Sequence, residues 1–339
     1  MTGLLDRLPA EDAQALREAP DSPGTAMLAT LSDRRDFGTG WILERKLDGI
    51  RALAARDGDR VRLLSRGAKP LDAAFPELVD ALAAQECADF TVDGEIVALK
   101  DGATDFSRLQ QRIGLTKPAQ ARKSSVAVTY FVFDLLRLEG KDTTRLPLLE
   151  RKSLLREALH FAAPLRYTTH RRATKDARPA LEEACSRGWE GLIAKRADAP
   201  YVHSRSGDWL KLKCARGQEF VVGGFTEPQG SRVGFGALLL GYHRSGSRLL
   251  RYAGKVGTGW NTRQLRALRS RLDELEQDDS PFDGEVRERG AVHWVRPELV
   301  AQIGFTEWTR DGMLRHPRYL GMREDKPARD VVREEAAGR

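Results

Sequence analysis

The feature of this chain that most constrains its fold is a series of short strand-like runs separated by Asp-Gly turns. From Trp41 onward the runs read WILERK, IRALAAR and RVRLLSR, with Asp-Gly or Asp-Gly-Asp between them. Such turns are typical of hairpins, so the pattern predicts an antiparallel meander. It also leaves Lys46 at the end of the first strand, beside the turn at Asp48-Gly49, where glycine lets a ligand approach the backbone.

The segments that follow alternate between helical and strand patterns. AAFPELVDALAAQE has helical periodicity, and PLLERKSLLREAL and KDARPALEEACSR are also expected to be helices. DFTVDGEIVAL is expected to form two strand segments around a turn at Asp93-Gly94. SSVAVTYFVFDLL is rich in β-branched and aromatic residues, which predicts a buried central strand, and GLIAKR and DWLKLK are expected to be short strands.

The composition and pattern of the sequence change after Lys213. A glycine-rich series of predicted short strands follows, interrupted by one predicted helix, NTRQLRALRSRLDELE. About five strands and one helix fit a small OB-like barrel. We therefore expect an α+β chain with a lead-in at 1–22, a first domain of antiparallel sheets with helices at 23–215, an OB-fold domain at 216–330 and a charged, frayed tail at 331–339.

Composition bounds the class of partner. The chain has 339 residues, and its 56 Lys and Arg against 49 Asp and Glu give a net charge of +7, which modestly favours a polyanionic partner. The apolar fraction of 41% describes a soluble globular protein. Because no apolar run is long enough to span a membrane and the N-terminus lacks the pattern of a signal peptide, we expect an intracellular location and no membrane association.

The cysteines and histidines predict no site of their own. Cys87, Cys185 and Cys214 are odd in number, far apart and never in a C-x-x-C pair, so we expect reduced structural thiols and not a disulfide or a zinc site. The six histidines show no metal-ligand spacing.

The K-x-D-G pattern at Lys46 has two interpretations on its own. It describes a surface lysine before a turn, or a covalent nucleophile whose pKa is lowered by a cationic or desolvated pocket. The second interpretation gains weight because five further segments could complete a nucleotide site. They are Ser65-Arg66-Gly67, Asp93-Gly94-Glu95, Tyr130 to Asp134, Glu190 to Lys195 and Trp209 to Lys213.

Each of these segments offers a group suited to a nucleotide. A guanidinium at Arg66 can bind a phosphate or ribose oxygen, and a carboxylate at Glu95 can bind a sugar hydroxyl or a metal. Phe133 can present an aromatic face to a purine, although taken alone it fits a core position better. Strand alternation puts Lys211 and Lys213 on one face, where a polyanion would relieve their mutual repulsion.

In their order along the chain, these motifs resemble those of ATP-dependent DNA ligases of the lysine nucleotidyl-transferase superfamily. The matching motifs are KLDGIR, SRG, DGE, YFVFD, EGLIAK, WLKLK and REDK. The nearest likeness is to the ligase domain of bacterial ligase D, the end-joining ligase. This implies an ATP-grasp-like adenylation domain followed by an OB-fold domain. One departure is that Arg66 and Gly67 are adjacent, where the family usually has a residue between them, which bears on the local turn and on the role of Arg66.

The resemblance implies a role for each matched residue. Lys46 would attack the α-phosphate of ATP, forming lysyl-AMP and releasing pyrophosphate, with its pKa lowered by Lys211, Lys213 and a divalent metal. The metal, Mg²⁺ or Mn²⁺, would be held by Glu95 and Glu190. The other implied nucleotide contacts are Glu44 beside adenine, Phe133 stacked on it, Arg51, Arg66 and Glu95 at the ribose and phosphates, Lys195 within the site, and Arg323, Asp325 and Lys326 from the second domain during the first step.

The resemblance also implies partners and a place in the cell. The substrate would be nicked or broken duplex DNA, with a Ku-like end-binding protein as a candidate partner, and the enzyme would be a cytoplasmic, nucleoid-associated monomer. Two alternatives stay open at this point. An RNA ligase or an mRNA-capping guanylyltransferase would use the same lysine chemistry, and a non-enzymatic nucleic-acid-binding module would keep the barrel without the reaction.

Overall fold

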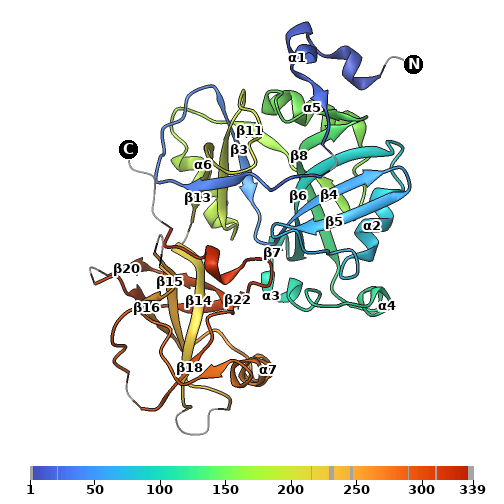
Figure 1. Cartoon of the computed structure of the whole chain (residues 1–339). Helices are drawn as coiled ribbons and strands as arrows, with labels where there is room; N and C mark the ends of the chain where they lie inside the picture. The colour runs from blue at the N-terminus through green and yellow to red at the C-terminus, as the bar shows by residue number, and fades with distance from the viewer. Residues whose placement is uncertain are drawn as a thin grey trace. The chain divides into compact units, whose positions relative to one another are not determined.

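The computed structural model of the chain describes residues 3–20, 22–214, 216–228, 233–244, 247–288, 290–309 and 311–334. The chain forms two compact units, the first ending at Cys214 and the second following it (Figure 1). Each unit combines β-sheets with a few helices, which confirms the expected α+β class.

The first sheet of the first unit is built around three long antiparallel strands. They are β4 (Ile50–Asp57), β6 (Asp89–Lys100) and β8 (Val128–Leu138), in the spatial order β8-β6-β4, with β5 (Arg60–Ser65) paired to β4. The shorter strands of this sheet are β1 (Arg17–Glu18), β7 (Ala103–Thr104), β9 (Lys141–Asp142) and β10 (Leu165–Tyr167).

Strand β6 overturns the prediction of a turn at Asp93-Gly94, because it runs unbroken through both residues. Its register against β8 shifts between Asp93 and Gly94, so the glycine marks a β-bulge within the strand. A Cβ on Gly94 would lie 2.5 Å from the carbonyl oxygen of Phe131 and 2.4 Å from the ring of Tyr130. Glycine is therefore required here by the close approach of β8.

The second sheet of the first unit has five strands in the order β11-β3-β12-β13-β2. The inner strands β3, β12 and β13 are antiparallel neighbours, and β2 joins β13 in parallel. The bounds of the five are β2 (Leu28–Leu31), β3 (Trp41–Lys46), β11 (His170–Arg172), β12 (Gly191–Arg196) and β13 (Arg205–Lys213).

The turn at Asp48-Gly49 carries the chain from the second sheet to the first. Strand β3 pairs with β11 and β12, whereas β4 pairs with β5 and β6. The predicted meander is therefore wrong at its first turn and right at its second, where β4 and β5 form a hairpin. A Cβ on Gly49 would lie 2.2 Å from the carbonyl oxygen of Ile96, so the crossing depends on a residue without a side chain.

The three longer predicted helices of this unit form where the sequence indicated. They are α2 (Pro76–Ala83), α5 (Leu148–Ala158) and α6 (Arg178–Ser186). Apolar residues of α2 and α5 pack with alternate residues of β4, such as Ala52 and Ala54, in the largest core of the unit. The shorter helices are η1 (Leu4–Arg7), α1 (Ala10–Ala15), α3 (Phe106–Leu109) and α4 (Pro118–Arg122), and leucines of the lead-in pack against the same core.

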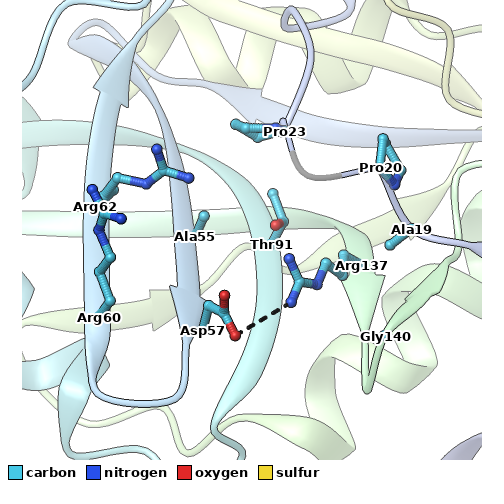
Figure 2. A pocket seen from close by; sticks show the side chains of 10 residues that line it. All are labelled: Ala19, Pro20, Pro23, Ala55, Asp57, Arg60, Arg62, Thr91, Arg137 and Gly140. Carbon is cyan, nitrogen blue, oxygen red and sulfur yellow. Dashed lines mark ion pairs between the residues drawn. The ribbon is translucent and has the colours of Figure 1, made fainter.

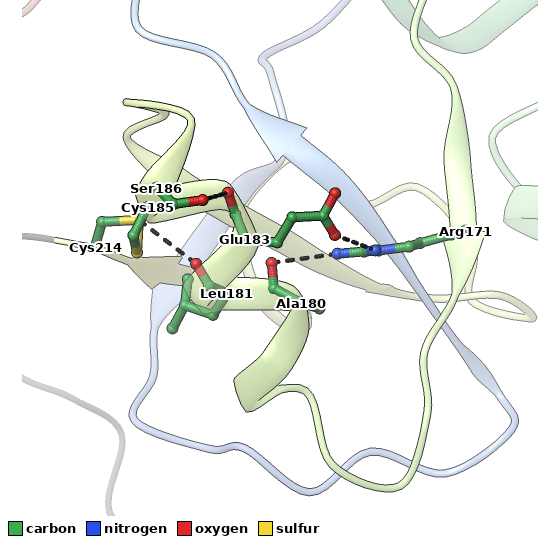
Figure 3. The surroundings of a disulfide bond; sticks show 7 residues. All are labelled: Arg171, Ala180, Leu181, Glu183, Cys185, Ser186 and Cys214. Carbon is green, nitrogen blue, oxygen red and sulfur yellow. Dashed lines mark hydrogen bonds and ion pairs between the residues drawn. A yellow bond between two sulfur atoms is a disulfide. The ribbon is translucent and has the colours of Figure 1, made fainter.

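A disulfide joins Cys185 to Cys214, which overturns the expectation of three reduced thiols (Figure 3). The two cysteines are 29 residues apart in sequence, but their Cα atoms are 5.4 Å apart. Helix α6 packs Leu181 and Ala184 on the second sheet, and this places its last turn beside the end of β13. Sequence spacing could not show this contact because packing creates it. Cys87 is the free, half-buried thiol of the three.

The second unit is an OB-fold barrel built on the long strand β14 (Arg216–Thr226), which pairs with β15, β18 and β19. Helix α7 (Thr262–Asp273) confirms the one predicted helix and begins with a capping box between Asn261 and Gln264. The remaining elements are β15 (Leu238–His243), β16 (Leu250–Val256), β17 (Glu276–Gln277), β18 (Val292–Val295), β19 (Val300–Phe305), β20 (Glu307–Trp308), β21 (Leu314–Arg315), β22 (Arg318–Met322) and η2 (Ala328–Asp330).

The segment after η2 differs from the frayed tail predicted at 331–339. Val331 is fully buried in the core of the second unit, and Val332 forms a β-bridge with His243. The backbone amide of Glu334 donates to the side chain of Gln218. Residues 335–339 of the predicted tail lie outside the described residues.

Replacing Gly49 with alanine tests the crossing between the sheets. We expect Gly49→Ala to destabilise the chain by about 1–3 kcal/mol, because the new methyl group meets a backbone carbonyl that cannot rotate away. Gly40→Ala is the matched control, since a Cβ there meets nothing within 4 Å. Urea denaturation midpoints measure both effects, and equal midpoints for the two variants would contradict this account.

Candidate active site

The second sheet places four charged residues on one face through its strand register. Lys46 of β3 lies opposite Gly191 of β12, which lies opposite Lys213 of β13. In the next row of the same face, Glu44 lies opposite Ile193, and Ile193 opposite Lys211. Directly paired residues project from the same face of a sheet, so Glu44, Lys46, Lys211 and Lys213 converge as the motifs predicted.

Lys46 is held by a carboxylate in this structure. Its ammonium forms an ion pair with Glu190, and its side chain is 16% exposed. Burial by itself would lower the pKa of Lys46, but Glu190, with Asp48 and Glu95, outweighs burial and raises it. This direction is opposite to the predicted lowering, and Lys46 is a protonated ammonium beside Glu190.

The first sheet contributes Arg51, Asp93 and Glu95 to the opposite side of the site. Arg51 lies directly across from Glu95 between β4 and β6. Its guanidinium makes a bidentate pair with the fully buried Asp93, at 2.5 Å for both contacts. The hydroxyl of Tyr201 donates to the same carboxylate at 2.6 Å. Sequence analysis missed Asp93 and Tyr201, since it treated Asp93 only as part of a turn.

Phe133 lies inside a small apolar cluster and is 7% exposed. The Arg51 guanidinium lies 4.6 Å and the Lys195 ammonium 4.2 Å from its ring centroid. The indole of Trp209 approaches it edge-on, with centroids 6.0 Å apart. The structure thus shows the core environment that sequence analysis weighed for Phe133, with cations against the ring.

Glu44 is the centre of a buried charge cluster. Lys152 reaches its Oε1 at 2.6 Å and Lys195 reaches its Oε2 at 2.6 Å, and all three side chains are almost completely buried. Burial would raise the pKa of Glu44, but the two ammonium groups outweigh burial and lower it. Burial lowers the pKa of Lys195, and Glu44 opposes that effect only in part.

Lys152 is the member of this cluster that sequence analysis missed. It lies on α5, where its ammonium also donates to the carbonyl oxygen of Thr168 at 3.0 Å. A signal was present in the sequence, because Leu148, Lys152 and Leu155 follow helical spacing and therefore share the apolar face of α5. A lysine on a buried face requires a buried carboxylate, and Glu44 supplies it.

Arg66 follows β5 in a tight turn. The amide of Ala68 donates to the carbonyl oxygen of Ser65 at 2.8 Å, and Ala68 has a φ of 59°. This left-handed residue accommodates the shortened motif in which Arg66 and Gly67 are adjacent. The Nη2 atom of Arg66 is buried and has no hydrogen-bond partner among the described residues, so it is available to a ligand oxygen.

The last motif belongs to the second unit. The Arg323 guanidinium makes a bidentate pair with Asp325, at 2.9 and 2.8 Å, and the ammonium of Lys326 lies 3.1 Å from the Glu219 carboxylate. These residues are therefore paired within their own unit.

Two general features of the described residues concern metal ions and membranes. No group of three or more His, Cys, Asp or Glu side chains in this part of the chain is arranged to hold a metal ion. Among the helices that the structure describes, none is long and apolar enough to cross a membrane.

Comparison with known families decides the class of the protein. A family model described as ATP dependent DNA ligase domain matches residues 26–213, and one described as ATP dependent DNA ligase C terminal region matches residues 231–326. The chain belongs to the ATP-dependent DNA ligase family. The resemblance drawn from the motifs is thus confirmed.

Individual relatives of this ligase chain agree with the family. The multifunctional non-homologous end joining protein LigD of Pseudomonas aeruginosa is 40% identical over 317 residues, which cover 92% of the chain and 36% of the relative. The LigD DNA repair protein of Mycobacterium tuberculosis is 39% identical over 303 residues, covering 87% of the chain and 37% of the relative. The chain thus spans a little over a third of the length of these curated relatives.

One solved structure matches closely over nearly its whole length. It is a mycobacterial DNA ligase D complexed with ATP and MES, with 33% identity and a TM-score of 0.65, covering 92% of this chain and 98% of the other. That match and the two family models agree on a nucleotidyl-transferase unit followed by an OB-fold unit.

The buried cluster around Glu44 predicts a pH-dependent contribution to stability. Glu44→Gln would leave two buried ammonium groups unpaired, at a cost on the order of 3 kcal/mol at neutral pH. Because the folded pKa of Glu44 is lowered from its usual 4.5, its stabilising contribution is present above pH 4.5 and is lost as pH falls through the lower folded pKa.

Urea midpoints of the wild type and Glu44→Gln, measured from neutral to acid pH, test this account. The difference in urea midpoint between the wild type and Glu44→Gln should be constant near neutrality and should narrow below pH 4.5. Glu182→Gln, at an exposed position on α6, is the control and should leave the midpoint unchanged. A gap that persisted unchanged into acid would show that the charge of Glu44 is not what stabilises the cluster.

The ion pair at Lys46 predicts a change in amine reactivity. Glu190→Gln removes the largest influence that raises the pKa of Lys46, so a larger fraction of the amine is neutral at a given pH. Kinetic labelling with an acylating reagent, in the absence of ATP, should show faster modification of Lys46 and a titration midpoint at lower pH. The same Glu182→Gln control should match the wild type, and an unchanged midpoint in Glu190→Gln would refute the assignment.

Proposed function

We propose that this chain is an ATP-dependent DNA ligase that seals breaks between 3′-hydroxyl and 5′-phosphate ends in duplex DNA. The observation that supports it best is the placement of Lys46. A single lysine is paired with Glu190 at the junction of two sheets, and Lys211 and Lys213 share its face. The two neighbouring lysines are the activating feature, because a nearby cation favours the neutral, nucleophilic amine of a lysine.

In the first step, the ammonium groups of Lys211 and Lys213 would bind the phosphates of ATP, because a polyanion relieves their mutual repulsion. The neutral amine of Lys46 would then attack the α-phosphate. A bond from Nζ to phosphorus forms, the bond between the α-phosphorus and its bridging oxygen breaks, and pyrophosphate leaves. The proton from Nζ must be transferred away, and the Glu190 carboxylate is its contacting acceptor.

Glu44, Arg51, Arg66, Phe133 and Lys195 would form the rest of the nucleotide pocket. The orphaned Nη2 of Arg66 suits a phosphate or ribose oxygen. Adenine would stack on Phe133 by displacing one of the two cations, Arg51 or Lys195, that lie against its ring. In the second unit, Arg323, Asp325 and Lys326 would orient the leaving pyrophosphate, as in the family. In the same proposal, residues 23–215 form the adenylation domain and residues 216–330 the OB-fold domain.

Glu95 and Glu190 would hold the divalent metal, Mg²⁺ or Mn²⁺. The donor set fits, since magnesium in nucleotide sites takes one or two carboxylates and completes its shell with waters and substrate phosphates. Glu190 contacts the Lys46 ammonium, and Glu95 lies across from Arg51 on the first sheet. When bound, the cation would supply positive charge against the α-phosphate and favour the neutral form of Lys46.

In the later steps AMP passes from Lys46 to the 5′-phosphate of the break, and the 3′-hydroxyl then displaces AMP to close the strand. The names of the LigD relatives support a role in end joining, in which a Ku-like protein would bring the ends together. We place the enzyme in the cytoplasm with the nucleoid, acting as a monomer.

A substitution at Lys46 tests the proposed function. Lys46→Ala should abolish both the covalent labelling of the protein by ATP and the sealing of a nicked duplex, because no other group can accept AMP at this position. Lys117→Ala, an exposed lysine at the start of α4, is the matched control and should retain both activities. Labelling by GTP alone, or sealing of RNA but not DNA, would overturn the proposal in favour of a capping enzyme or an RNA ligase.

A further inference from the structure

A pocket of about 330 Å³ lies on the first sheet, apart from the rows that contain Lys46 (Figure 2). Its floor comes from neighbouring strands of the sheet. Its wall comes from the N-terminal segment and from Gly140, in the turn between β8 and β9. The described lining residues are Ala19, Pro20, Pro23, Ala55, Asp57, Arg60, Arg62, Thr91, Arg137 and Gly140.

The strand register explains why a hollow forms here. Arg62, Ala55, Thr91 and Arg137 are successive cross-strand partners on β5, β4, β6 and β8. They therefore project from one face of the sheet in a single row. The two inner positions hold small side chains and the two outer positions hold arginines, which Figure 2 shows on either side of Ala55 and Thr91. The result is a shallow floor between two guanidinium groups.

The charges around this floor favour an anion. Arg137 is paired with Asp89, which lies outside the pocket lining, at 2.5 Å and with Asp57 at 3.8 Å. The guanidinium groups of Arg60 and Arg62 have no ion-pair partner among the described residues, although their backbones pair with β4. Among the described lining residues, three arginines therefore face one carboxylate, Asp57. Guanidinium donors bind phosphate oxygens in a planar fork, so a phosphate group suits these unpaired side chains.

The pocket is distinct from the nucleotide site but faces the same way. Strand β4 is regular, so Arg51, Leu53 and Ala55 project from one face. Four residues of strand span about 13 Å, which separates Ala55 of the pocket from Arg51 of the nucleotide site. Between them, Leu53 is buried beneath a cluster that includes Tyr201 and Trp209. A ligand must therefore reach the two sites separately.

From this geometry we infer that the pocket binds a backbone phosphate of the duplex DNA on which the ligase acts. The inference rests on the proposed function, because it takes DNA as the substrate. A contact of this kind anchors DNA without reading its sequence.

Salt dependence of DNA binding tests the inference. Arg60→Gln and Arg62→Gln should each weaken binding to a nicked duplex and reduce the slope of log affinity against log salt by about 1, the value expected for one lost phosphate contact. Arg156→Gln removes an equal charge from an exposed position on α5 and should leave the slope unchanged. Slopes for the pocket variants equal to that of Arg156→Gln would overturn the inference.

Neutral methylphosphonate linkages, placed one at a time near the nick, locate the contact. In the wild type, neutralising the one phosphate that the pocket holds should weaken binding at a linkage away from the nick. The double variant Arg60→Gln/Arg62→Gln should lose the sensitivity at that linkage and keep it elsewhere, as expected for coupled partners. The same sensitivity profile in both proteins would refute the site. Binding of inorganic phosphate by the pocket, without any linkage whose neutralisation weakens DNA binding, would also refute it.

Labelling of Lys46 by ATP without DNA separates the two proposals. Normal labelling and sealing by the wild type, with DNA affinity unaffected by the pocket variants, would reject the pocket and keep the proposed function. A wild-type chain that formed no adenylate would reject the proposed function itself. Labelling of Lys46 by ATP in the pocket variants also shows that these variants are folded.

Discussion

The site depends on one close backbone approach, where Gly49 passes the carbonyl oxygen of Ile96. This approach lets the chain leave the second sheet at Lys46 and enter the first sheet at Ile50 within three residues. Lys46 is therefore the last residue of β3 in the second sheet, and Arg51 is the second residue of β4 in the first sheet. Their side chains face a common space. A longer connection would separate the lysine from Glu95, which influences its pKa across that space. Lys46 is positioned by the junction of two sheets and not by a long loop.

Charge balance inside the first unit follows from the desolvation that this junction imposes. Lys46, Glu44 and Arg51 are all withdrawn from water, and each has an opposite charge in contact: Glu190, the Lys152 and Lys195 pair, and Asp93. A buried charge without such a partner would cost several kcal/mol. Glu190, Asp93 and Glu44 thus supply the counter-charges with which these cations are held in the first unit.

Sequence reasoning succeeded where local periodicity determines the structure. The helix at Pro76–Ala83 and the shared face of Lys211 and Lys213 follow from side-chain spacing alone. It failed where a tertiary contact decides between two local outcomes. Asp-Gly forms a crossing at Gly49 and a bulge at Gly94, because neighbouring strands approach both glycines too closely for a side chain. The Cys185–Cys214 disulfide and the burial of Lys152 likewise arise from helix packing.

Strand β4 couples the nucleotide site to the arginine pocket. It pairs without a register shift to both β5 and β6, so its side chains alternate strictly between the core and the opposite face. Ala52 and Ala54 pack in the core, and Arg51 and Ala55 therefore face the other side together. A slip of one residue would exchange the two faces and remove both sites at once. One regular strand thus fixes the spacing between Arg51, beside the Lys46 rows, and the proposed phosphate contact at Ala55.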